Sequence, residues 1–217
     1  MMRFIAFADT HTSLFRHRKI VQHAKNHKVD FLVCVGDFTL YCNYWKESLD
    51  ELAKAQIKMI FIPGNHEYQP RIIEEIEKYP FVVNIHQKVY TFNKIIFMGL
   101  GAQDYPHEKN HIKDVALRKK AKWQISIAKY PSVLLSHVPP KNTQTAKNLQ
   151  RDGGSKRTYQ WVCDIQPSLV LCGHIHRPAA RIDKIYTSSI YNVACQCHLF
   201  EMSSSSVYWL KELSLDK

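Results

Sequence analysis

The chain has 217 residues, of which 45% are hydrophobic and 23% are charged, and its formal net charge at pH 7 is +11. This composition is typical of a soluble globular protein and excludes intrinsic disorder, and a single domain over residues 1–217 is expected at this length. No apolar run approaches the ~20 residues that span a bilayer, and the stretch FIAFA meets Asp9 too early for a signal peptide, so we expect a cytoplasmic protein without a membrane partner.

The first third of the chain alternates between strand-like and helix-like segments. Short apolar runs predict strands at residues 3–9, 30–37 and 58–66, and the segments between them, 13–27 and 44–56, have the periodicity of helices. Strands and helices that alternate with short connections indicate a parallel sheet, because each return crossing needs a helix to cover the sheet.

Later segments add shorter strands. A short helix is expected near residues 70–78, and the strand-like runs 81–85, 88–92 and 94–100 lie so close in sequence that we expect an antiparallel element there. The remaining elements are expected as a helix at 111–129, a strand at 132–138, a helix at 155–165 and strands at 168–176, 181–187, 191–200 and 205–213. The serines at 203–206 are interpreted as a hairpin turn because strand-like residues follow directly.

The six cysteines lie mostly inside apolar runs, which indicates buried, reduced thiols. Cys195, Cys197 and His198 in the stretch ACQCH could form a soft metal site. One C-x-C pair without a second pair is a weak zinc signal, however, and packing within a strand is the favoured interpretation.

Polar residues of one chemical type follow the predicted central strands. In a doubly wound sheet the carboxyl ends of the parallel strands form a crevice in which ligands bind. We also expect Asp9 and His11, like the two histidines of GHIH, to point to the same side of an extended segment. Imidazole, carboxylate and amide groups suit borderline cations such as Mn²⁺, Fe²⁺ or Zn²⁺. The residues in question are Asp9, His11, Asp37, Asn65, His66, His137, His174 and His176.

The ordered set DTH, GD, GNHE, SH and GHIH, spread over residues 9–176, resembles the calcineurin-like metallophosphoesterase superfamily. Among its members the pattern is most similar to the small Icc-related phosphodiesterases, because the segment before GHIH contains a short Gly-Ser stretch, DGGSKR. The resemblance implies an α/β fold with two mixed, largely parallel central sheets that form a β-sandwich flanked by helices, in four layers α/β/β/α.

The same resemblance implies a centre of two divalent metal ions, most consistent with manganese, with iron, zinc or nickel as alternatives. It assigns Asp9, His11, Asp37 and His176 to the first metal, and Asp37, Asn65, His137 and His174 to the second. Asp37 would bridge the two ions, because the two oxygens of a carboxylate can each face one cation. His66 and Asp37 would be the catalytic residues, with His66 as the general acid for the leaving oxygen.

The reaction implied is hydrolysis of a phosphodiester bond, in a small or nucleotide-like substrate, by a metal-bound hydroxide. Two divalent cations against two aspartates leave an excess of about two positive charges, which a phosphodiester anion and a hydroxide would neutralise. The stretch GDFTLYCNYW lacks the Asp-Arg-Gly extension of the protein Ser/Thr phosphatases. Without that arginine a monoester dianion loses a bidentate partner, so action on phosphoproteins is disfavoured.

Two alternatives remain at this stage. A nuclease would use the net charge of +11 to follow a phosphate backbone, so a nucleic-acid partner is allowed but not required. A non-catalytic scaffold that kept the fold is the other alternative, although such proteins usually lose metal ligands and here each motif is present.

Substrate contacts and other histidines are less constrained by the sequence. Phe38, Tyr41, Tyr44 and Trp45 could stack on a nucleobase, but packing of Tyr41 and Trp45 at the start of a helix is favoured slightly. Basic residues that could meet phosphate oxygens are Arg151, Lys156, Arg157 and Arg177, with a solvated loop as the alternative. Two pairs with the spacing of helical chelators, expected to be surface histidines, are His23 with His27 and His107 with His111.

Overall fold

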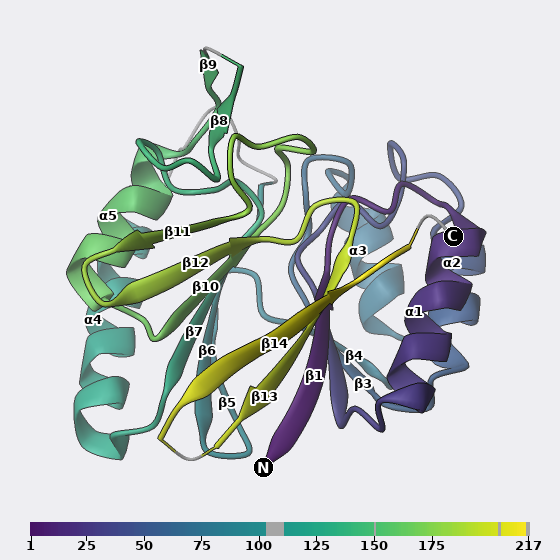
Figure 1. Cartoon of the computed structure of the whole chain (residues 1–217), viewed down its shortest axis with the longest axis horizontal. Helices are drawn as coiled ribbons and strands as arrows, with labels where there is room; N and C mark the ends of the chain where they lie inside the picture. The colour runs from purple at the N-terminus through teal and green to yellow at the C-terminus, as the bar shows by residue number, and fades with distance from the viewer. Residues whose placement is uncertain (103–110, 150, 204, 216–217) are drawn as a thin grey trace.

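The computed structural model describes residues 1–102, 111–149, 151–203 and 205–215. Within these residues, two six-stranded sheets face one another and helices cover their outer faces (Figure 1). In this view α1, α2 and α3 lie on one side of the molecule, and α4 and α5 lie on the other. No helix in the described part of the chain is long and apolar enough to cross a membrane.

The first sheet has the strand order β14-β13-β1-β2-β3-β4, in which β1 to β4 are parallel and β13 and β14 are antiparallel to their neighbours. Its strands are β1 (Met2–Phe7), β2 (Phe31–Cys34), β3 (Lys58–Phe61), β4 (Val82–Asn84), β13 (Cys197–Met202) and β14 (Val207–Leu213). Its helices are α1 (Leu14–Asn26), α2 (Trp45–Ala53) and α3 (Pro70–Glu77). Helix α1 begins at an N-cap, Ser13, whose side chain accepts a hydrogen bond from the backbone N–H of Arg16.

The second sheet has the strand order β11-β12-β10-β7-β6-β5, with four parallel central strands and antiparallel edge strands. Its strands are β5 (Val89–Phe92), β6 (Ile95–Leu100), β7 (Ser132–Ser136), β10 (Leu169–Cys172), β11 (Ile182–Ile185) and β12 (Ser188–Asn192). Its helices are α4 (His111–Ala128) and α5 (Lys156–Ile165), and a small hairpin of β8 (Lys147–Asn148) and β9 (Arg151–Asp152) projects beyond the sheet (Figure 1).

Successive side chains of the central strands point to opposite faces of the sheet and pack in separate apolar cores. Phe4 and Ala6 of β1 pack in the core between the sheets, whereas Ile5 and Phe7 pack against the first helix layer. A third core, which includes Trp161 of α5, lies between the second sheet and its helices. The α/β fold of two mixed, largely parallel sheets in four layers is therefore confirmed, with central strands such as β2 and β10 buried on both faces as parallel strands require.

One predicted strand is wrong in a way that matters for the site. The segment 191–200 was expected as one strand, but it divides between the sheets: β12 ends at Asn192 in the second sheet and β13 begins at Cys197 in the first. Between them Ala194 forms a parallel bridge with Ala8, directly before Asp9. The break is made by Cys195, whose φ of 60° is left-handed and ends the extended conformation. The predicted antiparallel element is β5 with β6, whereas β4 joins the first sheet, parallel to β3.

Candidate metal centre

The polar residues singled out in the sequence follow β1, β2, β3, β7 and β10, and the carboxyl ends of these strands converge from both sheets. The backbone turns sharply there: Asp9, Asp37 and His174 have φ values of 56°, 54° and 66°, and His11 has 45°. Non-glycine residues rarely adopt such values outside tight turns and functional sites. We expected Asp9 and His11, and likewise the two histidines of GHIH, to lie along extended segments. This expectation is wrong, because tight turns direct these side chains toward one another.

Asp9, His11 and His176 form the first group of potential ligands. Their ligand atoms lie within 4.8 Å of one another. Nε2 of His11 is 3.2 Å from Nε2 of His176, which in turn lies 3.3 Å from Oδ1 of Asp9. Asp9 and His176 lie far apart in the sequence, yet their donor atoms and that of His11 face one another at these distances. Such an arrangement is suited to bind one cation.

Asp37 lies at the centre of the remaining groups. It shares one cluster with Asp9 and His137 and another with His11 and His66, each within the same 4.8 Å limit. Its Oδ2 is 3.3 Å from Nε2 of His137, and its Oδ1 accepts a hydrogen bond of 2.8 Å from the backbone N–H of His66. A carboxylate in this central position can contact two cations at once.

Asn65 joins the two histidines of the second sheet. Its Oδ1 lies 3.1 Å from Nε2 of His137 and 2.9 Å from Nδ1 of His174. The other ring nitrogen of His137 donates to the backbone carbonyl of Val35 at 2.7 Å, which leaves Nε2 free to act as a ligand. The structure thus brings all seven predicted ligands and His66 into one cluster.

The charge distribution of the cluster in its metal-free form is also informative. Burial alone would lower the pKa of His137, but the Asp37 carboxylate outweighs it and raises this pKa to about 9. Contact with the Asp9 carboxylate raises the pKa of His176 to about 10. Burial lowers the pKa of His174 to about 4, helped by the charge of His137. Protonated imidazoles therefore balance the two aspartates, and cations that bind there must displace these protons.

The residues fit a pair of divalent cations. Within the described residues, Nδ1 of His11 is buried without a hydrogen-bond partner, and Oδ1 of Asp9 is buried with only the ion-pair contact to His176, which is costly unless another group completes their coordination. The set combines carboxylate, amide and imidazole donors without cysteine thiolate, as borderline cations prefer.

His66 faces the same cluster. The backbone N–H of Tyr41 donates to its Nδ1 at 3.1 Å, and the two rings lie 4.4 Å apart between centroids. Because a backbone N–H can only donate, Nδ1 is the acceptor and the ring proton of neutral His66 resides on Nε2. That atom lies 3.8 Å from Oδ2 of Asp37 and is the one directed toward the cluster.

Glu67 is a supporting residue that was not singled out in the sequence, although it ends the GNHE motif. It has no exposed surface, and its carboxylate accepts hydrogen bonds from the N–H groups of Asp37, Thr39 and Gly64 at 2.8, 2.9 and 2.8 Å. The hydroxyl of Thr39 donates a further bond of 2.6 Å. Glu67 thereby joins the loop after β2 to the loop after β3.

Two glycines allow these loops to approach. Gly36 has a φ of +93°, and a Cβ there would lie 2.5 Å from the backbone nitrogen of Gly64. A Cβ on Gly64 would lie 2.1 Å from Oδ1 of Asp37. The glycines of GD and GNHE are therefore required for steric reasons, because no side chain fits between the two loops.

The stretch ACQCH forms no shared metal site in the described residues. Cys195 lies near the cluster, with Sγ 3.6 Å from the carbonyl oxygen of Asp9, whereas Cys197 packs in the core under the first helix layer. His198 accepts a hydrogen bond of 3.2 Å from the indole N–H of Trp209. The favoured interpretation, packing within a strand, holds for Cys197 and His198.

The aromatic residues after Asp37 separate into two kinds. Phe38 is fully buried and is not available to a substrate, whereas Trp45 is partly buried and packs against the same core. Tyr41 and Tyr44 are 62% and 65% exposed, and the slight preference for packing of Tyr41 is therefore wrong. Tyr41 instead adopts a left-handed φ of 51° that places its ring on His66.

The remaining candidates lie away from the cluster or are exposed. His23 contacts the carbonyl oxygen of Ser214 at 3.1 Å and stacks on His27 at 6.3 Å, outside every group of potential ligands in the described residues. His107 and the side chain of His111 fall outside the described residues. Arg151, Lys156 and Arg177 are exposed, and Arg157 forms an ion pair with Asp114.

Comparison with known proteins gives a consistent result. Residues 2–178 match the family described as calcineurin-like phosphoesterase. No curated protein sequence matches the chain. Among solved structures, the protein TT1561 of Thermus thermophilus superposes with a TM-score of 0.72 at 15% identity, covering 99% of each chain.

Two further solved structures share the fold. A dimetal phosphatase from Danio rerio has a TM-score of 0.62 at 12% identity and 98% coverage of both chains. The NAD nucleotidase of Haemophilus influenzae has a TM-score of 0.62 at 12% identity, covering 97% of this chain and 49% of that one. At these identities the structural likeness shows the fold, and the family match over most of the sequence shows membership: this chain belongs to the calcineurin-like phosphoesterase family.

Proposed function

We propose that this metallophosphoesterase, as a single domain of residues 1–217, is a phosphodiesterase that acts on a small or nucleotide-like diester. The observation that carries the proposal is the convergence of two carboxylates, an amide and four imidazoles within hydrogen-bonding or ion-pair distance at the strand ends. Such a donor set serves metal-assisted hydrolysis in preference to structural metal binding, which usually relies on cysteine.

The first metal ion is assigned to Asp9, His11, Asp37 and His176, and the second to Asp37, Asn65, His137 and His174. The contact between His11 and His176 supports the first set, and the contacts of Asn65 with both histidines support the second. Asp37 is assigned as the bridge because it belongs to two of the clusters. Manganese is the proposed occupant, with iron, zinc or nickel as alternatives. When bound, such ions lower the pKa of water and stabilise negative charge on phosphoryl oxygens.

His66 is assigned as the general acid that protonates the leaving group. The N–H of Tyr41 fixes the ring and keeps the proton on Nε2, so His66 can donate a hydrogen bond, and finally a proton, to the ester oxygen that departs. Its position beside Asp37 keeps this donor next to the reacting phosphoryl group. Asp37 in turn holds the backbone of His66 through Oδ1, so the positions of the two residues are linked.

A diester is favoured over a monoester by the surroundings of the cluster. The loop Phe38–Trp45 contains no lysine or arginine that could pair with the second charge of a monoester dianion. It presents the exposed rings of Tyr41 and Tyr44 instead. Aromatic faces accept any nucleobase by stacking, which supports a nucleotide-like substrate; the fold shared with an NAD nucleotidase is compatible with that class.

The proposal is tested by metal reconstitution. Protein stripped with a chelator is mixed with Mn²⁺, and hydrolysis of bis(p-nitrophenyl) phosphate is measured beside that of p-nitrophenyl phosphate. Mn²⁺ is expected to restore activity, with the diester preferred. Asp37→Ala should abolish it, whereas Glu74→Ala, which removes an exposed carboxylate on α3, should not. Wild-type activity in Asp37→Ala would refute the mechanism, and preference for the monoester would refute the assignment of substrate class.

A further inference from the structure

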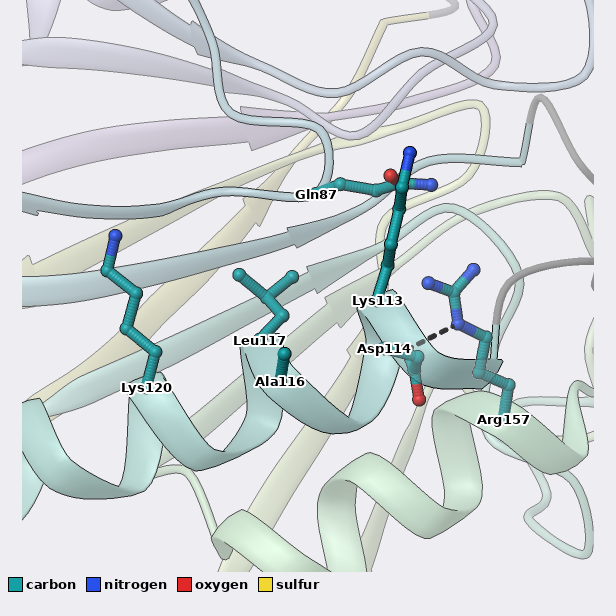
Figure 2. Close-up of a pocket in the computed structure, with 7 residues that line it drawn as sticks. All are labelled: Gln87, Lys113, Asp114, Ala116, Leu117, Lys120 and Arg157. Atoms are coloured by element: carbon teal, nitrogen blue, oxygen red, sulfur yellow. Dashed lines mark hydrogen bonds and ion pairs between the residues drawn. The ribbon is translucent and has the colours of Figure 1, made fainter.

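A second cavity lies outside the metal centre. It has a volume of about 350 Å³ and is lined by one face of α4, by Arg157 in the first turn of α5 and by Gln87 in the connection from β4 to β5 (Figure 2). None of the lining residues is among the proposed metal ligands. A cavity of this size matches the lower range of small-molecule sites.

The α4 face gives the cavity an apolar floor with cations at both ends. Lys113, Ala116, Leu117 and Lys120 recur at helical spacing, and Figure 2 shows Leu117 and Ala116 between the two lysines. Lys113 and Lys120 are exposed and form no ion pair within the described residues. The floor can therefore contact the apolar part of a ligand, and the two lysines remain available to pair with an anionic group of the same ligand.

Arg157 is held in position beside Lys113. Its Nε donates to Oδ1 of Asp114 at 2.8 Å, and the indole N–H of Trp161 donates to the same oxygen at 2.7 Å. Asp114 is 6% exposed and lies 3.3 Å, through Oδ2, from Nε of Arg118. The carboxylate is thus fixed from three sides and in turn fixes the plane of the Arg157 guanidinium.

The two terminal nitrogens of Arg157 are directed away from Asp114. Figure 2 shows them on the side of the cavity toward which Lys113 extends. A guanidinium whose Nε is already occupied still presents the paired N–H groups that match two oxygens of a phosphate or carboxylate. The described lining residues carry three cations and one carboxylate, and that carboxylate is already shared by two arginines, so positive charge is in excess among them.

We propose that this cavity is a second binding site, for a small organic phosphate whose phosphoryl group contacts Arg157 and Lys113 and whose apolar body lies on Ala116 and Leu117. This site uses none of the residues assigned to the metal centre. The proposal gives Arg157 the role of a phosphate contact, as the sequence suggested. The phosphate would be bound in this cavity, however, and not by the ligands of the metal centre.

Inorganic phosphate and adenosine monophosphate are suitable probes, and adenosine is the uncharged control. Binding is measured by calorimetry with the metal-loaded protein and again after chelation, because the metal centre also attracts phosphate. We expect one class of site to persist after chelation, with adenosine monophosphate bound more tightly than phosphate and with adenosine bound weakly. Binding that disappears entirely with the metal would overturn the proposal, as would phosphate that binds without preference for the nucleotide, which would indicate an adventitious ion only.

Substitutions identify the residues. Arg157→Gln and Lys113→Gln should each weaken the persistent site about tenfold or more, the usual effect of a lost charge-assisted hydrogen bond. Lys122→Gln on exposed α4 surface outside the cavity is the matched control and should bind as the wild type does. Lys113→Gln removes an exposed side chain, so it tests the proposal even if Arg157→Gln, which frees the buried Asp114, folds poorly. Unchanged affinity in Lys113→Gln and Arg157→Gln would refute the site.

Discussion

Replacement of Glu67 by glutamine tests whether the loops that carry Asp37 and Asn65 are held by a buried carboxylate. One oxygen of Glu67 accepts from the N–H groups of Asp37 and Gly64, and the other accepts from the N–H and hydroxyl of Thr39. An amide can offer its oxygen to one side only, so its NH₂ group must face at least one backbone N–H.

The size of the effect follows from that mismatch. The best arrangement turns the NH₂ group toward Thr39, whose hydroxyl can rotate and accept while its backbone N–H stays unpaired. One buried donor without a partner costs about 1–3 kcal/mol. For a protein of this size each kcal/mol lowers the melting temperature by about 2–4 °C. Displacement of Asp37 should also weaken metal binding, by about 10–100-fold for a lost outer contact of a ligand.

The assay combines thermal unfolding of the metal-free protein with a titration of activity against Mn²⁺. Glu67→Gln should melt at a lower temperature and need more Mn²⁺ for half-maximal hydrolysis of bis(p-nitrophenyl) phosphate. Glu74→Gln, which makes the same chemical change on the exposed face of α3, should match the wild type in both measurements. The reasoning is refuted if Glu67→Gln has both the melting temperature and the Mn²⁺ dependence of the wild type.

Three further predictions follow from single contacts. Gly64→Ala should destabilise the fold by about 1–3 kcal/mol in chemical unfolding because its Cβ meets Asp37 at 2.1 Å, whereas in Gly153→Ala the Cβ meets only the end of a flexible side chain and the loss should be smaller. Burial lowers the pKa of His17 to about 4, so folding keeps its ring neutral; the resulting stability is complete above pH 6.5 and is lost as the pH falls toward 4. Between pH 7 and pH 5 the wild type should therefore lose about 2 kcal/mol more unfolding free energy than His17→Gln, and equal losses would contradict this assignment. Tyr41→Phe should retain activity, because the contact with His66 is made by the ring and the backbone N–H, while Tyr41→Ala should raise the KM for nucleotide diesters; an unchanged KM would exclude stacking by this ring.

The sequence predicted that these polar residues would lie close together, because each of them follows the end of a strand. Asp9, Asp37 and His137 directly follow apolar runs, and the carboxyl ends of such strands meet in a layered α/β fold whatever the details of the loops. The convergence of these residues therefore followed from the topology, which hydrophobic periodicity reveals, whereas their assignment as metal ligands came from the resemblance of the motifs.

Features that depend on loop conformation were not predictable in the same way. The left-handed turn at Tyr41 directs its ring onto His66, and no local pattern in GDFTLYCNYW indicates that turn. The break at Cys195 was missed because YNVACQCH contains strand-favouring tyrosine and valine and neither glycine nor proline, so propensity favours one continuous strand. The role of Glu67 required knowledge that two loops approach each other, which is a tertiary contact.

The position of β13 has a consequence for how the protein is made. β1 is hydrogen-bonded on one side to β2, its near neighbour in sequence, and on the other to β13, with partners such as Phe4 and Phe200. During synthesis the ribosome must deliver the chain as far as Met202 before this second edge is fully paired. Contacts this distant in sequence slow folding and leave an unpaired edge exposed in the nascent chain. Truncation before Cys197 should therefore yield aggregation-prone material, even though each of the proposed metal ligands would already have been translated.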